Sequence, residues 1–350
     1  MTTGLSGGSM RAPNRKPMVS VVMPVFNAEL FLAEAIDSTL AQTFEDLELI
    51  AVDDESTDTS LEILRNYASQ DDRIRVIARP HTGIAGARND GIEAASGKYV
   101  AALDNDDAMY PQRLERQVAF LEEQDDCVAV GAAAMLVDVD GDPLIERRMP
   151  GPADDIEREL LDGRNPMMQP GVMFRRDALL EVGGYREAFN FSEDFDLFLR
   201  LSERGRLSNL DEVLLRHRQH INRASVSQFE QQQRVAEQAL REAYARRGLD
   251  RELPTIPMAW HPDTHVGYHT RCASDAWDGG NIDTVRKHAR ALRRLNPFSL
   301  RAMELYSRTL MGRRTYDLVT SIKSWLRPLK AMAGGQHGDQ KSGGNGTGTE

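Results

Sequence analysis

Cysteine is almost absent from this sequence of 350 residues, which contains only Cys127 and Cys272. Two cysteines cannot form a disulfide framework, and a structural zinc site needs further cysteines or clustered histidines. We therefore expect both thiols to be reduced and to act as small apolar side chains in a cytoplasmic protein.

Surplus positive charge and long apolar runs are also missing. The formal net charge is −11, which argues against a nucleic-acid binder because binding to phosphates depends on an excess of Lys and Arg. No apolar run approaches the length of about 18 residues that a membrane-spanning helix requires. Residues 1–17 lack the apolar stretch of a signal peptide, so a flexible leader is expected there, and the Gly-rich residues 334–350 predict a disordered tail.

Strand-like and helix-like patterns alternate between Met18 and Leu103. The first strand covers residues 19–23 and is closed by Pro24. Further strands are predicted over residues 47–52, 75–78 and 99–103, and helices over residues 29–41, from 58 onward and over 85–95. Such alternation predicts an α/β fold with a mainly parallel sheet flanked by helices, which binds ligands beyond the carboxyl ends of its strands. This domain is expected over residues 18–229, followed by a helical C-terminal region over residues 230–333.

Carboxylates gather directly after two of these strands. Asp53 and Asp54 follow one strand, and Asp104, Asp106 and Asp107 follow another. Like charges this close need a compensating cation, and Mg²⁺ or Mn²⁺ prefers carboxylates together with substrate phosphates. The pattern therefore indicates a metal-assisted site for a nucleoside diphosphate. Helix capping near Asp53 and a solvated acidic turn near Asp106 are the alternatives.

Two further features lie near helix starts. The small-residue loop from Gly83 to Asn89 is not a GxGxxG motif, but it permits close backbone approach, and its Arg88 suits a base or a phosphate. Glu193 and Asp194 open a later apolar helix. Acidic residues there are either stabilised by the helix dipole or available as a general base, and the residues alone leave both interpretations open.

At this point the sequence resembles the family 2 glycosyltransferases, which have the GT-A fold. The resemblance covers about residues 19–227. The matching segments come in the family's order and comprise residues 19–27, 52–58, 87–89, 103–107, 183–185, 193–200 and 218–220. Glu55 stands where glycine is common in the family.

The resemblance implies a role for each matching residue. It places Asp194 as the catalytic base and Asp106 as the direct ligand of Mg²⁺ or Mn²⁺, with Asp104 beside the diphosphate. Arg218 is expected to reach the diphosphate, and His220 to lie near the metal unless it is a surface histidine. The residues implied on the nucleotide side are Pro24, Phe26, Asn27, Glu29, Asp53, Asp54 and Arg88.

The resemblance also implies an activity. A sugar would pass, with inversion at its anomeric carbon, from a nucleoside-diphosphate donor, of UDP type by this resemblance, to a hydroxyl group. The acceptor would be a saccharide or a lipid-linked glycan in polysaccharide synthesis at the inner face of a membrane. A nucleotidyltransferase and a non-catalytic nucleotide-sugar-binding protein are the alternatives. A receiver-type signalling domain is disfavoured, because a whole strand and helix precede the acidic pair.

The charge balance reverses near the C-terminus. Basic residues outnumber acidic ones between Asn281 and Lys330, and an apolar stripe runs through residues 316–329. This combination suits a helix over about residues 311–330 that lies on an anionic membrane surface. A helix packed on the catalytic domain, with a solvated basic face, is the other interpretation.

Overall fold

A computed structural model describes residues 16–151, 153–221, 229–256, 264–298 and 300–311. The expected leader (apart from Lys16 and Pro17), the expected tail and nearly all of the expected amphipathic helix lie outside the described residues. The strands are β1 Val19–Val25, β2 Leu47–Asp53, β3 Ile74–Ala78, β4 Tyr99–Ala102, β5 Ala108–Met109, β6 Cys127–Val137, β7 Pro143–Arg147, β8 Met173–Arg175 and β9 Arg206–Arg218.

Helices connect these strands and extend the chain beyond them. They are α1 Leu32–Leu40, α2 Ser60–Ala68, α3 Ile84–Ala94, α4 Arg113–Glu123, α5 Ala153–Leu161, α6 Arg176–Glu181, α7 Glu193–Leu201, α9 Phe229–Arg247, α10 His265–Asp278, α11 Ile282–Leu295 and α12 Leu300–Met311. Two short 3₁₀ turns cover Gln169–Gly171 and Glu187–Phe189.

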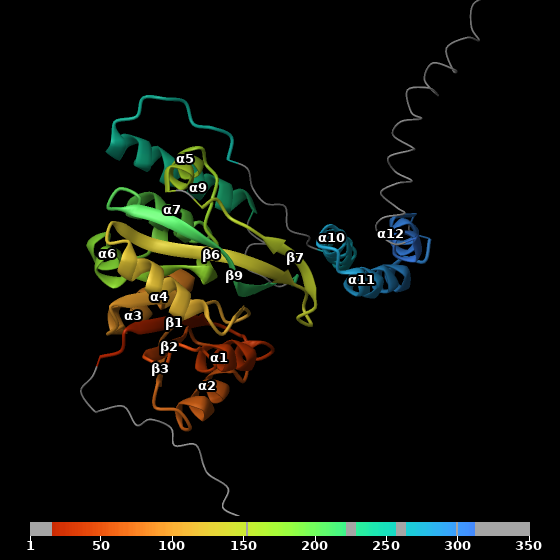
Figure 1. The fold of residues 1–350 in the computed structure, drawn as a ribbon, viewed down its shortest axis with the longest axis horizontal. Coiled ribbons are helices and arrows are strands. Elements are labelled where there is room, and N and C mark those ends of the chain that lie inside the picture. Colours follow the sequence, from red (N-terminus) through yellow and green to blue (C-terminus); the bar gives the residue numbers. More distant parts are fainter. Residues whose placement is uncertain (1–15, 152, 222–228, 257–263, 299, 312–350) are drawn as a thin grey trace, which may run out of the picture.

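All nine strands form one sheet in the order β3-β2-β1-β4-β8-β6-β9-β5, with β7 paired to β6. The four strands from β3 to β4 are parallel, β8 is antiparallel to both neighbours, and β6 runs parallel to β9. The expected parallel sheet flanked by helices, with a helical C-terminal extension, is therefore confirmed (Figure 1).

Alternating side chains of the central strands enter two separate cores. Val22 and Ile50 face a core shared with α3, α5, α6, α7 and α9, whereas Val21 and Leu49 face a core shared with α1, α2 and α4. This alternation follows from the two-residue period of a strand covered on both faces. Both cysteines are free and buried, as expected, and burial raises the pKa of the Cys127 thiol to about 11.

Strand β1 continues through Pro24 to Val25 instead of ending before the proline. The ladder between β1 and β4 stops at Val22 opposite Ala102. On that side the carbonyl of Pro24 accepts a hydrogen bond of 2.9 Å from Asn105 Nδ2. The missing N–H of the proline therefore removes no ladder bond, and the strand tolerates it.

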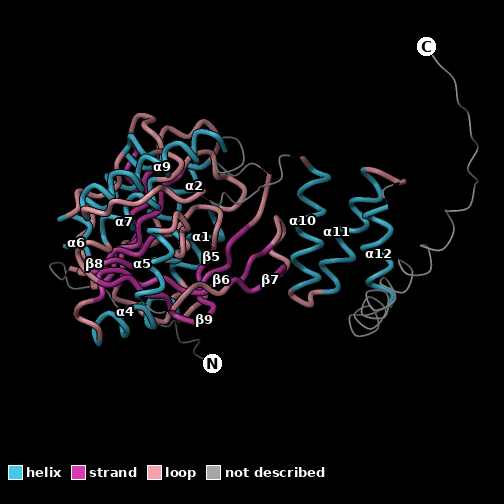
Figure 2. The backbone as a smooth tube through the Cα atoms, turned by 90° about the horizontal axis from the view of Figure 1, so that it is seen from above, coloured by secondary structure: helices cyan, strands magenta, loops and turns pink. Residues whose placement is uncertain are grey.

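Helices α10–α12 stack beside the sheet, next to β7 (Figure 2). Tyr268 and Trp277 pack with Leu144 of β7 in a small separate core. A Cβ on Gly279 would lie 2.0 Å from the carbonyl oxygen of Leu144, so only glycine permits this close approach. Helix α9, by contrast, packs into the core beside α7. We therefore propose that the division between the two parts falls after α9 and not at residue 230.

Among the described residues, no helix is both long and apolar enough to span a bilayer.

Candidate active site

An acidic cluster occupies the turn that follows β4. Ligand oxygens of Asp104, Asp106 and Asp107 all lie within 4.8 Å of one another. Asp107 is buried, accepts the backbone N–H of Arg218 at 2.8 Å and pairs with His217 Nδ1 at 2.8 Å. Asp107 therefore anchors the turn, and the half-buried Asp104 and Asp106 are the members at the sheet edge.

Strand β9 brings Arg218 and His220 to the same turn. His220 Nε2 lies 2.9 Å from Asp106 Oδ2, so the two residues expected near the metal are in contact. Arg218 is buried, donates from Nε to the backbone oxygen of Asp106 at 3.0 Å and forms an ion pair with Glu34. Its guanidinium also lies 4.8 Å from the centre of the Phe31 ring. Arg218 thus holds the backbone of the acidic turn in place and joins it to Glu34 of α1.

Arg88 connects the acidic turn to the start of α7. Its Nη2 donates to Asp104 Oδ1 at 2.9 Å and its Nη1 to Glu193 Oε1 at 2.7 Å. Burial alone would lower the pKa of Arg88, but the charges of Asp104 and Glu193 raise it above the ordinary value. The side chain therefore stays charged and holds two motifs together that are far apart in the sequence.

Asp194 follows Glu193 and is half-buried. Its Oδ2 accepts a hydrogen bond of 2.8 Å from Asn165 Nδ2. Burial raises the pKa of the Asp194 carboxyl, while Arg88, the backbone N–H of Phe195 and Asn165 oppose that rise. A carboxylate with a raised pKa is a better proton acceptor. Asn165 was not singled out from the sequence, because a lone asparagine in a loop carries no local signal.

The loop after β1 is locked to the loop after β2. Asn27 Oδ1 accepts the backbone N–H of Thr57 at 2.8 Å, and Glu29 Oε2 accepts the Thr59 hydroxyl at 2.7 Å. These two expected nucleotide contacts therefore shape the loop. Phe26 is 46% exposed, and its ring centroid lies 4.7 Å from that of His81, which presents an aromatic surface at the edge of the sheet.

The adjacent aspartates at the end of β2 differ in their surroundings. Asp54 accepts the backbone N–H groups of Thr82 at 3.0 Å and Gly83 at 2.9 Å, so it fixes the loop that enters α3. Asp53 is buried, and within the described part of the chain its Oδ1 has no hydrogen-bond partner. A buried carboxylate oxygen without a partner is costly, which makes Asp53 the better candidate for a ligand contact.

Glu55 occupies the position where the family commonly has glycine. Its φ angle is +65°, in the left-handed region that favours glycine, and its Oε2 accepts the backbone N–H of His81 at 3.1 Å. The side-chain bond compensates for the unfavourable backbone conformation.

The acidic turn fits a divalent cation on chemical grounds. Carboxylate oxygens of Asp104 and Asp106, with the imidazole of His220 at 2.9 Å from Asp106, form a donor set that suits Mg²⁺ or Mn²⁺. Asp107 has both oxygens engaged by His217 and Arg218 and serves better as support. We therefore retain Asp106 as the candidate ligand.

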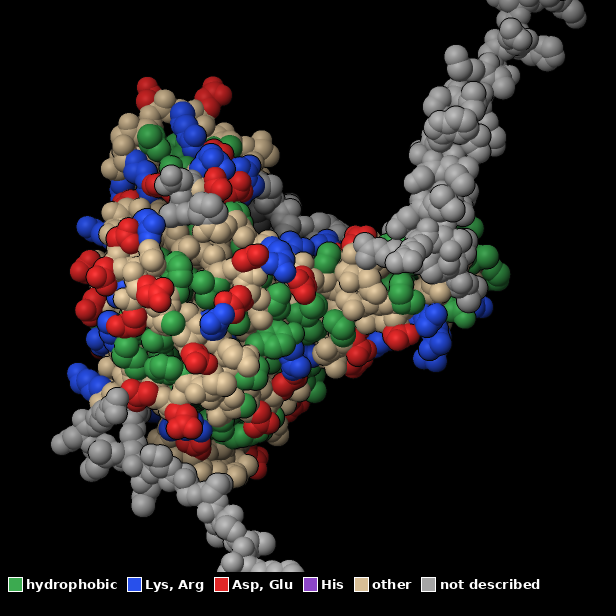
Figure 3. Space-filling model, in the orientation of Figure 1, with side chains coloured by type: hydrophobic (Ala, Val, Ile, Leu, Met, Phe, Trp, Pro, Cys, Tyr) green, Lys and Arg blue, Asp and Glu red, His purple; other side chains and the backbone are tan. Residues whose placement is uncertain are grey.

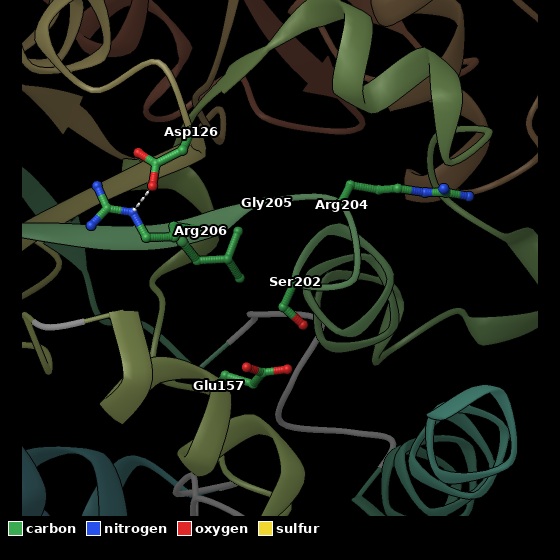
Figure 4. Close-up of a pocket in the computed structure, with 7 residues that line it drawn as sticks. Asp126, Glu157, Ser202, Arg204, Gly205 and Arg206 are labelled. Atoms are coloured by element: carbon green, nitrogen blue, oxygen red, sulfur yellow. Dashed lines mark ion pairs between the residues drawn. The ribbon is translucent and has the colours of Figure 1, made fainter. Parts of the chain in front are cut away.

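A separate pocket of about 290 Å³ is lined by residues that include Asp126, Glu157, Ser202 and Arg206. Figure 4 shows the ion pair between Asp126 and Arg206, with Arg204 directed away from it. Cys127, next to Asp126, pairs with Arg206 at the start of both strands, whereas the acidic turn follows the end of β4. The pocket therefore lies at the opposite edge of the sheet from the candidate active site.

Comparisons with known proteins agree with this geometry. The sequence model of the glycosyl transferase family 2 matches residues 20–183. The putative glycosyltransferase EpsE of Bacillus subtilis (strain 168) is 37% identical over 213 residues, which cover 59% of this chain and 74% of that protein. The O-antigen biosynthesis glycosyltransferase WbnJ of Escherichia coli is 32% identical over 209 residues, which cover 58% of this chain and 80% of that protein.

Other matches are to part of longer enzymes or to the fold alone. The hyaluronan synthase of Pasteurella multocida is 30% identical over 216 residues, 62% of this chain but only 22% of that enzyme. A crystal structure of S. aureus TarS residues 1–349 in complex with UDP-GlcNAc aligns with a TM-score of 0.54 at 19% identity, covering 83% of this chain and 79% of that one. The arrangement of motifs along the sheet edge and these relatives lead to one conclusion: the chain belongs to glycosyl transferase family 2 and is a glycosyltransferase.

Proposed function

We propose that this glycosyltransferase moves a sugar, with inversion at the anomeric carbon, from a UDP-type nucleotide sugar to a hydroxyl group of a saccharide or lipid-linked acceptor. The product would belong to a polysaccharide or another glycan. The observation that carries the proposal is the bridge from Asp104 through Arg88 to Glu193, because it joins the acidic turn to the helix that presents Asp194.

The donor would bind along the edge formed by the loops after β1, β2 and β4. The exposed ring of Phe26 suits stacking on the base, and the unpartnered oxygen of Asp53 suits a hydroxyl or amide donor of the nucleoside. Pro24, Asn27, Glu29 and Asp54 shape the loops around that position by the hydrogen bonds described above. Arg88 and Arg218 supply positive charge behind the diphosphate.

The site has a place for a divalent cation and a place for a base. Asp106, with Asp104 and His220 beside it, would hold Mg²⁺ or Mn²⁺, whose charge would stabilise the departing diphosphate. Asp194 would accept the proton of the acceptor hydroxyl as the hydroxyl oxygen attacks the anomeric carbon from the face opposite the departing diphosphate. Asn165 holds the Asp194 carboxylate at 2.8 Å and so orients it for this step.

Calorimetric titration of the purified protein with UDP, dTDP and GDP, first with Mn²⁺ and then with EDTA, tests the donor site. We expect UDP to bind, and we expect EDTA or Asp106→Ala to weaken that binding. Binding of dTDP or GDP alone would replace the UDP assignment. Failure of all three to bind to folded protein would overturn the proposed donor site, and equal binding in EDTA would overturn the metal assignment.

Asp194→Asn tests the proposed base. A positioned base contributes about 10²–10⁴ in rate, so turnover should fall by that factor while the affinity for UDP stays unchanged. The readouts are release of the nucleoside diphosphate and the calorimetric Kd. Turnover close to that of the wild type would contradict the role of Asp194.

A further inference from the structure

Large apolar side chains are exposed at the corner between α11 and α12. Phe298 is 91% exposed, Leu300 82%, Met303 56% and Leu295 49%. Single exposed apolar residues are common on soluble proteins, but four within nine consecutive positions form a patch that indicates an interaction surface. We refer to these four residues as the α11–α12 corner.

The folding of the helical extension does not require this corner. Helices α11 and α12 pack on each other and on α10 through Ala273, Ala289, Leu292 and Leu305, which are all buried. The corner residues lie outside that core. Their contact with water is therefore unfavourable, and no packing contact within the described part of the chain compensates for it.

Positive charge surrounds the corner. Arg290, Arg293 and Arg294 are exposed on the last turns of α11, and the guanidinium of Arg293 lies 5.6 Å from the centre of the Tyr306 ring. The sequence from Arg290 to Met303 contains arginines and no acidic residue, although the whole chain has a net charge of −11. Figure 3 shows apolar and basic side chains next to each other at the outer end of the extension.

The extension is attached to the sheet near the candidate active site. Lys287 and His288 of α11 contact Asp138 at 2.5 Å and 3.0 Å. The backbone oxygens of Asp138 and Val139 in turn accept Arg218 Nη1 at 3.3 Å and 3.0 Å. The helical extension and the support of the acidic turn are therefore joined by one network of hydrogen bonds through Asp138.

We propose that the α11–α12 corner docks on an anionic lipid bilayer. Phe298 and Leu300 would enter the boundary between headgroups and acyl chains, and Arg290, Arg293 and Arg294 would lie at the level of the lipid phosphates. Exposed aromatic and aliphatic side chains flanked by arginines match the chemistry of that boundary, which is apolar below and negatively charged above. This inference concerns a surface separate from the donor site and does not depend on the donor.

Co-sedimentation of the full-length protein with vesicles tests the proposal. Vesicles of phosphatidylcholine with one quarter phosphatidylglycerol are compared with vesicles of phosphatidylcholine alone. We expect binding to the anionic vesicles only. Phe298→Ser/Leu300→Ser should weaken it at least about tenfold, because both side chains leave the apolar layer. Arg290→Gln/Arg294→Gln should weaken it roughly twenty-fivefold, since each arginine contributes about a factor of five.

Matched variants elsewhere on the surface control for general changes in apolarity and charge. Leu180→Ser/Leu249→Ser replaces exposed leucines, and Arg65→Gln/Arg241→Gln replaces exposed arginines. Both should bind the anionic vesicles as the wild type does. The corner residues lie outside the core of the extension. The corner variants should therefore keep the wild-type circular dichroism and the same UDP affinity.

Three results would overturn the proposal. The first is no binding of the wild type to anionic vesicles, and the second is equal binding to neutral and anionic vesicles. The third is binding that survives both corner variants, which would place the membrane contact elsewhere in the chain. Sedimentation without lipid adds a further check, since self-association lost in Phe298→Ser/Leu300→Ser would assign the corner to a second copy of the chain.

Discussion

Opposing influences act on the carboxylate of Asp194. Burial favours its protonated form and raises its pKa, whereas Arg88, the backbone N–H of Phe195 and Asn165 favour the charged form. The balance gives a carboxylate with a raised pKa that is still held in one orientation by the bond from Asn165 Nδ2. A general base needs both properties, and neither could be inferred from Asp194 and its sequence neighbours alone.

Asn165→Leu should raise the pKa of Asp194 further, because a hydrogen bond donated to the charged form is lost. Protonated Asp194 cannot accept the proton of the acceptor, so the acidic limb of the kcat profile should move to higher pH. Steady-state turnover between pH 4 and 8 measures this shift. At a pH well above the limb the variant should recover much of its turnover, and an unmoved limb would assign Asn165 a role in packing only.

Arg88→Met should destabilise the fold strongly. The substitution leaves the buried Glu193 and the half-buried Asp104 without their shared counter-charge, and breaking a buried pair in this way costs about 3–5 kcal/mol. Urea unfolding followed by far-UV circular dichroism, which reports on the helices and strands of the whole fold, gives the change in unfolding free energy. The control is Arg116→Met, which removes the exposed pair with Glu212 and should leave the unfolding midpoint nearly unchanged.

The residues that could be predicted are those with a local pattern. Asp104 and Asp106 stand directly after an apolar strand, and Arg88 lies in a recognisable run of small residues. The structure places that run in the first turns of α3 and not in a loop. Asn165 could not be found in the same way, because its contact with Asp194 is made between a loop and a helix that only the tertiary structure brings together. The bond from Arg88 to Glu193 was missed for the same reason.

At the scale of elements, a charged cluster joins α11 to the turn after β6. Lys287 Nζ lies 2.5 Å from Asp138, 2.6 Å from Asp140 and 2.6 Å from Asp142. Hydrogen bonds from His288 and Lys287 overcome the effect of burial and lower the pKa of Asp138 to about 2. The ammonium group thus lies among three carboxylates of this turn and offsets part of their charge.

His269 continues this network into α10. Its Nδ1 lies 2.8 Å from Nδ1 of His288, whose Nε2 lies 3.0 Å from Asp138 Oδ2. Both bonds are satisfied if His269 donates to His288 and His288 donates to Asp138, with both rings neutral. Burial and the neighbouring His288 accordingly lower the pKa of His269 from 6.5 to about 4.

The stability of the protein should therefore fall between pH 6.5 and 4. His269 binds a proton more readily when unfolded, so its contribution is present above pH 6.5 and is lost as the pH falls towards 4. Since His269 is half-buried, solvent screening limits the effect to about 1 kcal/mol, a shift in Tm of roughly 2–4 °C. Thermal melts at pH 7 and pH 5 should show a smaller difference for His269→Gln than for the wild type, and an equal difference in both proteins would contradict this role of His269.

Strand β9 was the largest element that sequence patterns did not indicate. Its exposed residues Asp211 and Glu212 interrupt the alternation of apolar and polar side chains, and the pairing with β6 shifts register there, from Ala132 opposite Leu210 to Ala133 opposite Val213. Periodicity predicts strands only while the alternation persists. The parallel strands β1, β2 and β4 were found because they are nearly continuous apolar runs, interrupted only by Ser20 in β1 and by Glu48 in β2.

At the scale of the whole molecule, the two parts of the chain have unequal cores. The sheet is covered on both faces by large clusters, whereas α10–α12 rest on two small ones. The nucleotidyltransferase alternative rested on the acidic residues at the strand ends. Those residues are now explained by membership of glycosyl transferase family 2, so the alternative loses its support. The α/β fold class followed from the periodicity of the sequence, whereas the proposed division after α9 rests on the packing of that helix.

Amides in α12 should exchange with solvent before those of the sheet. Fewer buried apolar contacts mean a smaller opening free energy. We expect exchange at least about a hundredfold faster in α12 than in β1, equivalent to a difference in opening free energy of about 3 kcal/mol. Hydrogen exchange read by mass spectrometry measures both regions at once, and equal protection would show that the extension and the sheet unfold as one unit.

The length of β9 has a consequence for how this chain can vary. From Leu215 opposite Ala134 to Arg218 opposite Val137 the pairing with β6 is regular, and successive side chains point to opposite faces. Deleting one residue there would exchange the positions of His217 and Arg218 relative to the acidic turn. Related sequences should therefore accept insertions in the connections at residues 140–142 and 148–151, but keep the distance along the chain from Asp194 to Arg218. The length of β9 thus fixes the spacing between the proposed base, Asp194, and the arginine that supports the acidic turn, Arg218.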